Sequence, residues 1–383
     1  LISLMASVTN VMSVAPTMAS MIGLAVGIDY ALFIVTRHRQ HLEQGLGVGE
    51  SVGLAIHTAG RSVVFAGLTV VISMLGLTLV GIPLIASMGV AVAMTVAVAV
   101  LVAVTFLPAL LGVIGTNIDR LRTPFVKVRA EVDADSSEAW SARWARSVTR
   151  HPWRALAVGV PVLIMLAVPA ASLRTGWPDA RNRPAGSPPR VAFDLLTDGF
   201  GIGANAPLLV VADLRGAEPD AAGTIANGLS RLEGVASVSP PLPNDTGTTA
   251  IIQVTPTAGP EDQATETLVR AIRSDTTIAD AAGAEIEVTG ATAFYIDISK
   301  RLNDRLPVFI AAVVTLSFLL LTAVFRAPLV AAKAAAMNLL GIAAAYGVVV
   351  AVFQWGWAKG AIGLEQTVPI ISFLPMGLFA VLF

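Results

Sequence analysis

The stretch from Gly23 to Arg39 reads GLAVGIDYALFIVTRHR and decides the class of fold. Its part up to Thr36, together with the uncharged residues that precede it back to Pro16, forms an apolar run of about 20 residues, the length of a helix that crosses the core of a bilayer. Asp29 lies about halfway along this run. A carboxylate at that depth is costly, so a membrane helix that carries one usually packs against protein. The stretch therefore predicts a polytopic α-helical membrane protein.

The rest of the chain contains further apolar runs of similar length. We predict membrane spans near residues 16–36, 62–82, 86–114, 155–173, 306–325 and 334–354. Residues up to about Val8 are interpreted as the end of an earlier span, and 368–383 as the start of a later one. Because Leu1 and Phe383 both lie inside apolar runs, we expect an internal piece of a longer chain, and no signal peptide is assigned.

Charge is concentrated in one segment of the chain. Only 13% of the 383 residues are charged, against about 25% in a soluble domain, yet residues 174–304 hold 17 of the 26 acids and 10 of the 25 bases. Membrane spans plus one polar insert account for this distribution. With 17 acids against 10 bases, the insert has a net charge of −7. We interpret it as a solvated surface, and an acidic funnel for a cationic substrate is the alternative.

The connecting segments favour one orientation in the membrane. Basic residues gather in segments 37–61, 115–154 and 326–333. Counting the predicted crossings places all three on the same side, which the positive-inside bias makes the cytoplasmic side. The polar insert then lies on the extracytoplasmic side.

Within the insert, β-rich runs alternate with amphipathic helical runs. Strands are predicted at 206–214, 235–239, 248–256 and 285–290, and helices at 219–232 and 260–274. This βαββαβ order is that of a ferredoxin-like α+β sandwich. Residues 175–205 are rich in Gly and Pro and are interpreted as a linker. Segment 48–60 is predicted to be an interfacial amphipathic helix that joins two spans.

Asp29 and its neighbours form the candidate site. An acid can gain and lose a proton in each working cycle, which a fixed charge such as Arg cannot do. Tyr30 offers a hydroxyl donor, and Phe33 lies one turn from Asp29 on the same side of the helix. Gly23 and Gly27 form a GxxxG pair, which lets another helix approach closely. We predict a proton relay at Asp29 and Tyr30, with Gly23, Gly27 and Phe33 as packing residues.

Other polar residues give weaker evidence of a functional role. Six hydroxyl or amide residues in spans are possible hydrogen-bond partners of Asp29, although packing or bonding to their own helix explains them as well; they are Ser73, Ser87, Thr95, Thr105, Ser317 and Asn338. The four histidines lie in predicted cytoplasmic segments without metal-like spacing and are expected to be solvated; they are His38, His41, His57 and His151.

Several chemistries are missing from the sequence. It contains no cysteine and no GxxxxGK[ST] or HExxH motif, so we expect no enzyme, no metal site and no cofactor. The formal net charge of −1 gives no basic footprint, so nucleic acid is not an expected partner.

The residues around Asp29 resemble a known family. GLAVGIDYALFIVTRHR resembles the Asp-Tyr span of the MmpL (mycobacterial membrane protein large) family of the resistance-nodulation-division (RND) superfamily. The next stretch, HTAGRSVVFAGLTVVISMLGL from His57 to Leu77, is similar to the helix and span that follow it there, and the run from Arg305 to Trp357 is similar as well. The resemblance extends over essentially the whole chain.

This resemblance implies a twelve-span exporter built of two halves, each with an extracytoplasmic porter domain. It divides the chain into 1–114 (end of the third to the sixth span), 115–153 (cytoplasmic linker), 154–174 (a span), 175–304 (porter domain) and 305–383 (spans of the second half, ending in the tenth). Asp29 and Tyr30 match the first of two Asp-Tyr pairs. The stretch around Pro375 is similar to that around Pro16, and aligning them puts the counterpart of Asp29 just beyond Phe383.

The leading hypothesis is a proton-driven exporter in the plasma membrane whose partners are protons and a lipid or other hydrophobic substrate. A sterol- or lipid-sensing receptor of the same superfamily, without transport, is the main alternative. A protein-export accessory factor and a passive membrane scaffold are the others. The substrate and the oligomeric state stay open.

Overall fold

The computed structural model describes residues 14–119, 140–361, 363 and 366–382. The predicted end of an earlier span, up to about Val8, lies outside these residues, as does most of the predicted linker 115–153. The chain divides into two compact units. The helical unit comprises the chain up to Ala171 together with Arg305–Gly347 and Met376–Phe383, and the sheet unit comprises Ser172–Asp304 and Val348–Pro375.

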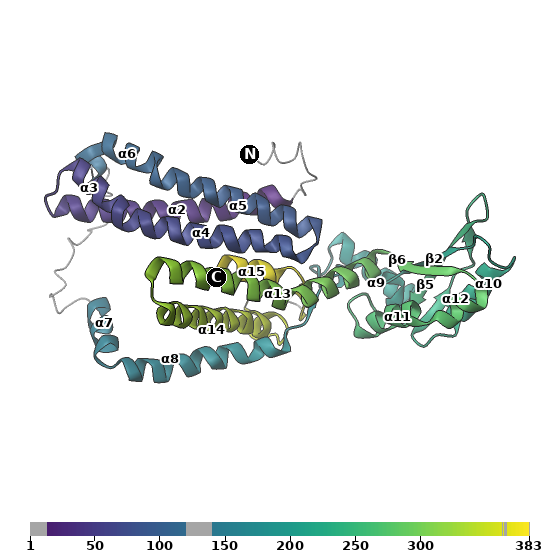
Figure 1. Cartoon of the computed structure of the whole chain (residues 1–383). Helices are drawn as coiled ribbons and strands as arrows, with labels where there is room; N and C mark the ends of the chain where they lie inside the picture. The colour runs from purple at the N-terminus through teal and green to yellow at the C-terminus, as the bar shows by residue number, and fades with distance from the viewer. Residues whose placement is uncertain (1–13, 120–139, 362, 364–365, 383) are drawn as a thin grey trace. The chain divides into compact units, whose positions relative to one another are not determined.

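Helices dominate the first unit (Figure 1). Six helices in the described part of the chain are long and apolar enough to cross a membrane, which confirms the predicted spans and a multi-pass membrane protein. The helices are α2 (Val14–Glu43), α3 (Val48–Ala55), α4 (Arg61–Gly76), α5 (Pro83–Val104), α6 (Phe106–Ile114), α7 (Trp140–Arg150), α8 (Pro152–Ala167), α13 (Ala291–Phe325), α14 (Pro328–Phe353) and α15 (Leu374–Leu382). The first residues of α13 and the last of α14 belong to the sheet unit.

The segment predicted as a separate interfacial helix, 48–60, is continuous with the span that follows. Helix α3 runs through a π-helical turn, Ile56–Gly60, directly into α4. No proline and no left-handed glycine separates them, and Gly60 has helical angles (φ −60°, ψ −40°). Without such a breaker the backbone has no reason to leave the helix, so one helix continues to Val80.

Three helices, α2, α4 and α5, form the core of the helical unit and lie side by side (Figure 1). A cluster of small and branched residues packs these helices together with the π-helical turn and α6; its buried members are Ile34, Ala59, Val63, Ala103 and Leu111. Since lipid tails are as apolar as these side chains, close packing rather than hydrophobicity stabilises the contact.

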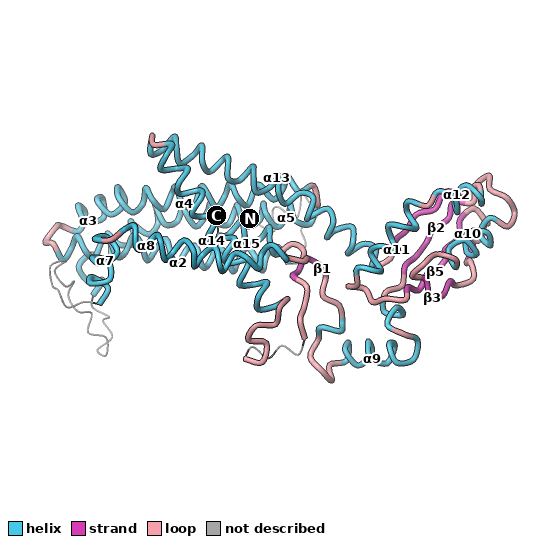
Figure 2. Tube along the Cα trace, turned by 90° about the horizontal axis from the view of Figure 1, so that it is seen from below, coloured by secondary structure: helices cyan, strands magenta, loops and turns pink. Residues whose placement is uncertain are grey.

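The sheet unit contains the predicted βαββαβ fold (Figure 2). The elements are β2 (Leu208–Asp213), α10 (Ala221–Ser230), β3 (Val235–Val238), β5 (Thr249–Pro256), α11 (Gln263–Ser274) and β6 (Glu285–Thr289). The strand order β3-β5-β2-β6 is antiparallel throughout. Alternate residues of β2 are buried, and central Val210 pairs with Ile252 and Val288. This alternation is what a sheet with one covered face requires.

The unit also contains elements that the sequence did not predict. Strand β4 (Leu242–Pro243) pairs with β5, and α12 (Thr276–Ala282) follows α11. The segment interpreted as a linker, 175–205, contains the helix α9 (Pro188–Phe200). Its two prolines occupy the first turn, where a missing N–H costs nothing, so the Pro-rich sequence begins a helix here. Strands β1 (Thr175–Gly176) and β7 (Ile370–Ile371) pair in parallel and join both segments of the unit.

Candidate functional site

The GxxxG pair of α2 lies against α5. A Cβ atom added to Gly23 would lie 2.3 Å from Cγ2 of Thr95, and one added to Gly27 would lie 4.0 Å from Cβ of Ala99. The first distance is a clash and the second an ordinary contact. Helices α2 and α5 therefore pack more tightly at Gly23 than at Gly27, and a side chain at position 23 would have to displace Thr95.

Tyr30 continues this packed side of the helix. Its ring is half-buried beside the core cluster around Ile34. A Cβ atom added to Gly67 of α4 would lie 3.4 Å from ring carbon Cε2 of Tyr30 and 2.1 Å from Cγ2 of Val100. The absence of a side chain at Gly67 thus makes room for Val100 of α5, and the Tyr30 ring lies at ordinary contact distance from the same position.

Asp29 and Phe33 lie on a different side of α2. Both belong to an exposed stripe at helical spacing, whose large members are Met21, Leu24, Ile28, Leu32 and Phe33. Phe33 is 44% exposed. No hydrogen bond or ion pair joins the Asp29 carboxylate to another residue of the described chain. The helix thus presents one acid within an apolar stripe that the described elements leave open, and its expected protein neighbour is not among them.

The hydroxyl groups considered as partners of Asp29 bond elsewhere. Ser87, Thr95 and Thr105 donate to carbonyl oxygens of their own helices at 2.8, 2.9 and 2.5 Å. Ser73 and Ser317 are buried, and neither hydroxyl has a hydrogen-bond partner among the described residues. Among the described residues, none of these five hydroxyl groups forms a hydrogen bond with the Asp29 carboxylate.

One histidine differs from the expectation of a solvated side chain. His38, near the end of α2, is fully buried, and its Nδ1 lies 2.8 Å from the Ser51 hydroxyl of α3. The same hydroxyl lies 2.8 Å from the His38 carbonyl oxygen. The two polar residues His38 and Ser51 were visible in the sequence. The packing of α3 against α2, which brings them together, could not be predicted from their spacing.

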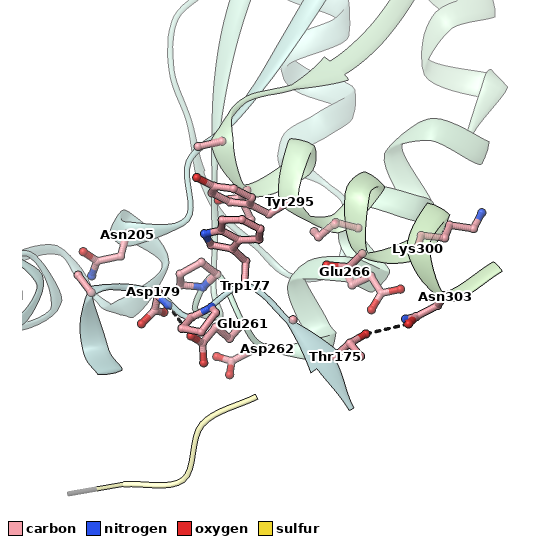
Figure 3. Close-up of a pocket in the computed structure, with 18 of the residues that line it drawn as sticks. Thr175, Trp177, Asp179, Asn205, Glu261, Asp262, Glu266, Tyr295, Lys300 and Asn303 are labelled. Carbon is pink, nitrogen blue, oxygen red and sulfur yellow. Dashed lines mark hydrogen bonds between the residues drawn. The ribbon is translucent and has the colours of Figure 1, made fainter. Parts of the chain in front are cut away.

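A second candidate site is a cavity of about 540 Å³ in the sheet unit (Figure 3). The rings of Trp177 and Tyr295 stack in its wall with centroids 4.7 Å apart and planes 9° from parallel. Glu266, Lys300 and Asn303 also line it. A volume of this size with an aromatic wall and a few polar groups is typical of a small-molecule site. Sequence analysis missed it because its wall combines the assumed linker with the start of α13.

Carboxylates tie the edge of this cavity together. Glu261 accepts hydrogen bonds from the backbone N–H of Asp179 at 2.6 Å, from Nδ2 of Asn182 at 2.5 Å and from Nη2 of Arg181 at 3.3 Å. Burial raises the pKa of Glu261, the hydrogen bond from the Asp179 backbone N–H lowers it, and the Asp179 carboxylate raises it. Burial also raises the pKa of Asp179, while Arg181 lowers both pKa values. The guanidinium therefore stabilises two acids that are costly to charge.

No group of three or more His, Asp or Glu residues that could hold a metal ion occurs among the described residues. The chemistry that these two regions offer is proton binding at Asp29 and ligand binding in the cavity.

Comparison with known proteins relates the chain to membrane transporters. The sequence model of the MMPL family matches residues 1–157 and 217–377. Membrane protein YdfJ of Bacillus subtilis is 40% identical over 379 residues, which cover 98% of this chain and 51% of YdfJ. The mycolic acid-containing lipids exporter MmpL11 of Mycolicibacterium smegmatis is 30% identical over 390 residues, which cover 100% of this chain and 41% of MmpL11.

A further relative has a different printed role. The heme uptake protein MmpL11 of Mycobacterium tuberculosis is 31% identical over 371 residues, which cover 95% of this chain and 38% of that protein. The chain thus spans about half the length of these relatives or less.

The contact between α2 and α5 can be tested at its glycines. Gly23→Val should destabilise the chain by about 1–3 kcal/mol, because the added atoms overlap Thr95. Gly27→Ala, with an ordinary 4.0 Å contact, is the matched control and should be nearly neutral. Unfolding of the purified chain by sodium dodecyl sulfate, followed by circular dichroism, measures both. Equal stability of the two variants would contradict the close approach at Gly23.

The carboxylate network should respond to pH through Arg181. Arg181→Gln should lower the stability of the sheet unit by about 1–3 kcal/mol at neutral pH, because two buried acids lose their cation. Without Arg181 their folded-state pKa values rise further above the unfolded ones. The folded state then holds protons more tightly, so the deficit shrinks as the pH falls through the folded-state pKa values.

Thermal unfolding followed by near-ultraviolet circular dichroism, which senses the stacked Trp177, measures this deficit at neutral and acidic pH. The control is Arg183→Gln, since Arg183 is exposed and forms no ion pair with another described residue. A deficit that stays constant with pH would show that Arg181 acts by packing alone.

Proposed function

Because the chain belongs to the MMPL family, we propose that it forms part of a proton-driven exporter of lipids or other hydrophobic compounds. The observation that carries the proposal is Asp29, a single acid on the exposed apolar stripe of a membrane helix. An ionised carboxylate facing hydrocarbon is unfavourable, so this position is useful only where protonation or a protein neighbour neutralises it.

The neighbour that we propose is a helix from the part of the protein that this chain does not span. About half or more of each reported relative lies outside the stretch that matches this chain, which is enough for a second set of helices. In the proposed cycle Asp29 takes up a proton from the extracytoplasmic side, becomes neutral and allows the covering helix to move. Release of the proton toward the cytoplasm restores the charged state. Tyr30, whose ring lies on the packed side of α2, is proposed to donate a hydrogen bond to Asp29 only when the covering helix is in place.

Helix α13 is the element that we propose connects the proton step to the substrate. It runs without interruption from Ala291 to Phe325, and its first turns supply Tyr295 and Asn303 to the cavity. Pro307 removes a backbone hydrogen bond directly after the boundary at Asp304, and such positions are where helices bend. Bending there would change the cavity wall during the cycle.

The cavity is proposed to hold the polar end of a hydrophobic substrate. Stacked rings favour contact with apolar or flat groups, and carboxylates beside them favour hydroxyl-bearing or cationic groups. Two relatives named for hydrophobic molecules, one a lipids exporter and one a heme uptake protein, support this substrate class. Because their names imply opposite directions, the decisive assay has to measure both efflux and uptake.

The test compares Asp29→Asn with wild type in the full-length protein, at matched expression, with and without a protonophore. Asparagine retains size and hydrogen bonding but cannot release a proton at this position. We expect substrate efflux by the variant to fall to the level of wild type with protonophore, while the variant still inserts into the membrane. Asp245→Asn, at an exposed turn of the sheet unit, is the matched control and should transport normally.

Each other outcome rejects part of the proposal. Full transport by Asp29→Asn would place proton coupling elsewhere. Inward movement of substrate would show that the protein imports its substrate rather than exporting it. A wild type that binds lipid and moves nothing would favour a receptor.

A further inference from the structure

Helix α7 has a basic face that the transport proposal does not use. Arg143, Arg146 and Arg150 follow one another at helical spacing, so they share one side of the helix. Together with Ser147 and His151 they line a shallow cavity of about 260 Å³. The surrounding sequence from Trp140 to Trp153, WSARWARSVTRHPW, contains no acid. We refer to the five residues that line this cavity, Arg143, Arg146, Ser147, Arg150 and His151, as the basic face.

The other side of α7 is apolar. It carries Trp144, Ala145 and Val148. Trp144 is 62% exposed, and Trp153, at the start of α8, is 81% exposed. A helix with arginines on one side and an indole on the other is suited to the plane between headgroups and acyl chains, because each side then meets its own solvent. Tryptophan in particular is enriched at that depth.

Chain connectivity puts α7 at the membrane surface. Only His151 separates α7 from α8, the helix that begins the span Pro152–Ser172. Its backbone angles (φ −131°, ψ 60°) are not helical, and α7 turns away from the direction of α8 (Figure 1). A helix that leaves the span direction one residue before the span begins cannot be far from the headgroups.

We propose that α7 is an interfacial helix whose basic face binds the phosphate groups of anionic phospholipids. Guanidinium groups donate paired hydrogen bonds to phosphate oxygens, and several of them on one surface helix match a negatively charged leaflet. An acidic protein segment would attract the guanidinium groups but leave the indole side in water. A lipid surface satisfies both sides at once, which is why it is the occupant favoured here.

Labelling at defined positions can test the orientation of α7, because the chain contains no cysteine. Single variants Ala145→Cys, on the apolar side, and Ser147→Cys, on the basic face, are labelled with a nitroxide after reconstitution of the chain. The vesicles consist of phosphatidylcholine alone or of equal parts phosphatidylcholine and phosphatidylglycerol. With phosphatidylglycerol, the label at 145 should be relaxed mainly by oxygen and the label at 147 mainly by an aqueous nickel chelate.

Spin-labelled lipids test the recognition itself. Phosphatidylglycerol should be preferred to phosphatidylcholine at the protein boundary by about fivefold for each arginine engaged. The triple variant Arg143→Gln, Arg146→Gln, Arg150→Gln should lose this preference. A triple variant with the same charge change in the sheet unit, Arg215→Gln, Arg231→Gln, Arg270→Gln, should retain it.

Three results would overturn the proposal. They are a preference that survives the α7 triple variant, a label at 145 that stays in water in both kinds of vesicle, and protection of the label at 147 from the nickel chelate by soluble polyglutamate. The last would identify an acidic polypeptide as the partner.

Discussion

A carboxylate halfway along a membrane helix is the constraint on which the proposed mechanism depends. Asp29 occupies an exposed apolar stripe of α2, and hydrocarbon cannot solvate its charge. The other side of the same helix packs closely against protein, because the absence of a side chain at Gly23 allows α5 to approach. Helix α2 therefore has one side fixed by packing within this chain and another that requires a neighbour. This asymmetry is what a moving helix interface needs.

The sheet unit also contains acids whose charge has to be stabilised, in contact with water rather than with lipid. Its excess of acids is tolerable on a solvated surface, but Asp179 and Glu261 are partly buried and depend on Arg181. The network ties the segment that enters the unit to the beginning of α11 and borders the cavity. Charge thus shapes the rim of the proposed substrate site, while the stacked rings of Trp177 and Tyr295 give it an apolar wall.

Elements with strong periodicity were predictable, and those set by tertiary contacts were not. The six spans and the βαββαβ order follow from runs of apolar residues and from alternation, both of which are local. Helix α9 was missed because its prolines suggested a linker, although prolines also begin helices. The burial of His38 depends on the return of α3 against α2, which no local pattern records. The candidate site residues are predictions from the sequence, but the different orientations of Asp29 and Tyr30 required the packed helices.

Those different orientations bear on how a proton event could be transmitted. Adjacent residues of an α-helix point about 100° apart, so Asp29 can face a covering helix while Tyr30 lies over Gly67. Since Gly23 leaves no room for a Cβ atom beside Thr95 and the Tyr30 ring packs over Gly67, a rotation of α2 would push against α5 and α4. A change in the charge of Asp29 would therefore move the three helices together rather than reorient one side chain. Glycine packing on one side of α2 is thus what would convert a local protonation into a rigid-body movement.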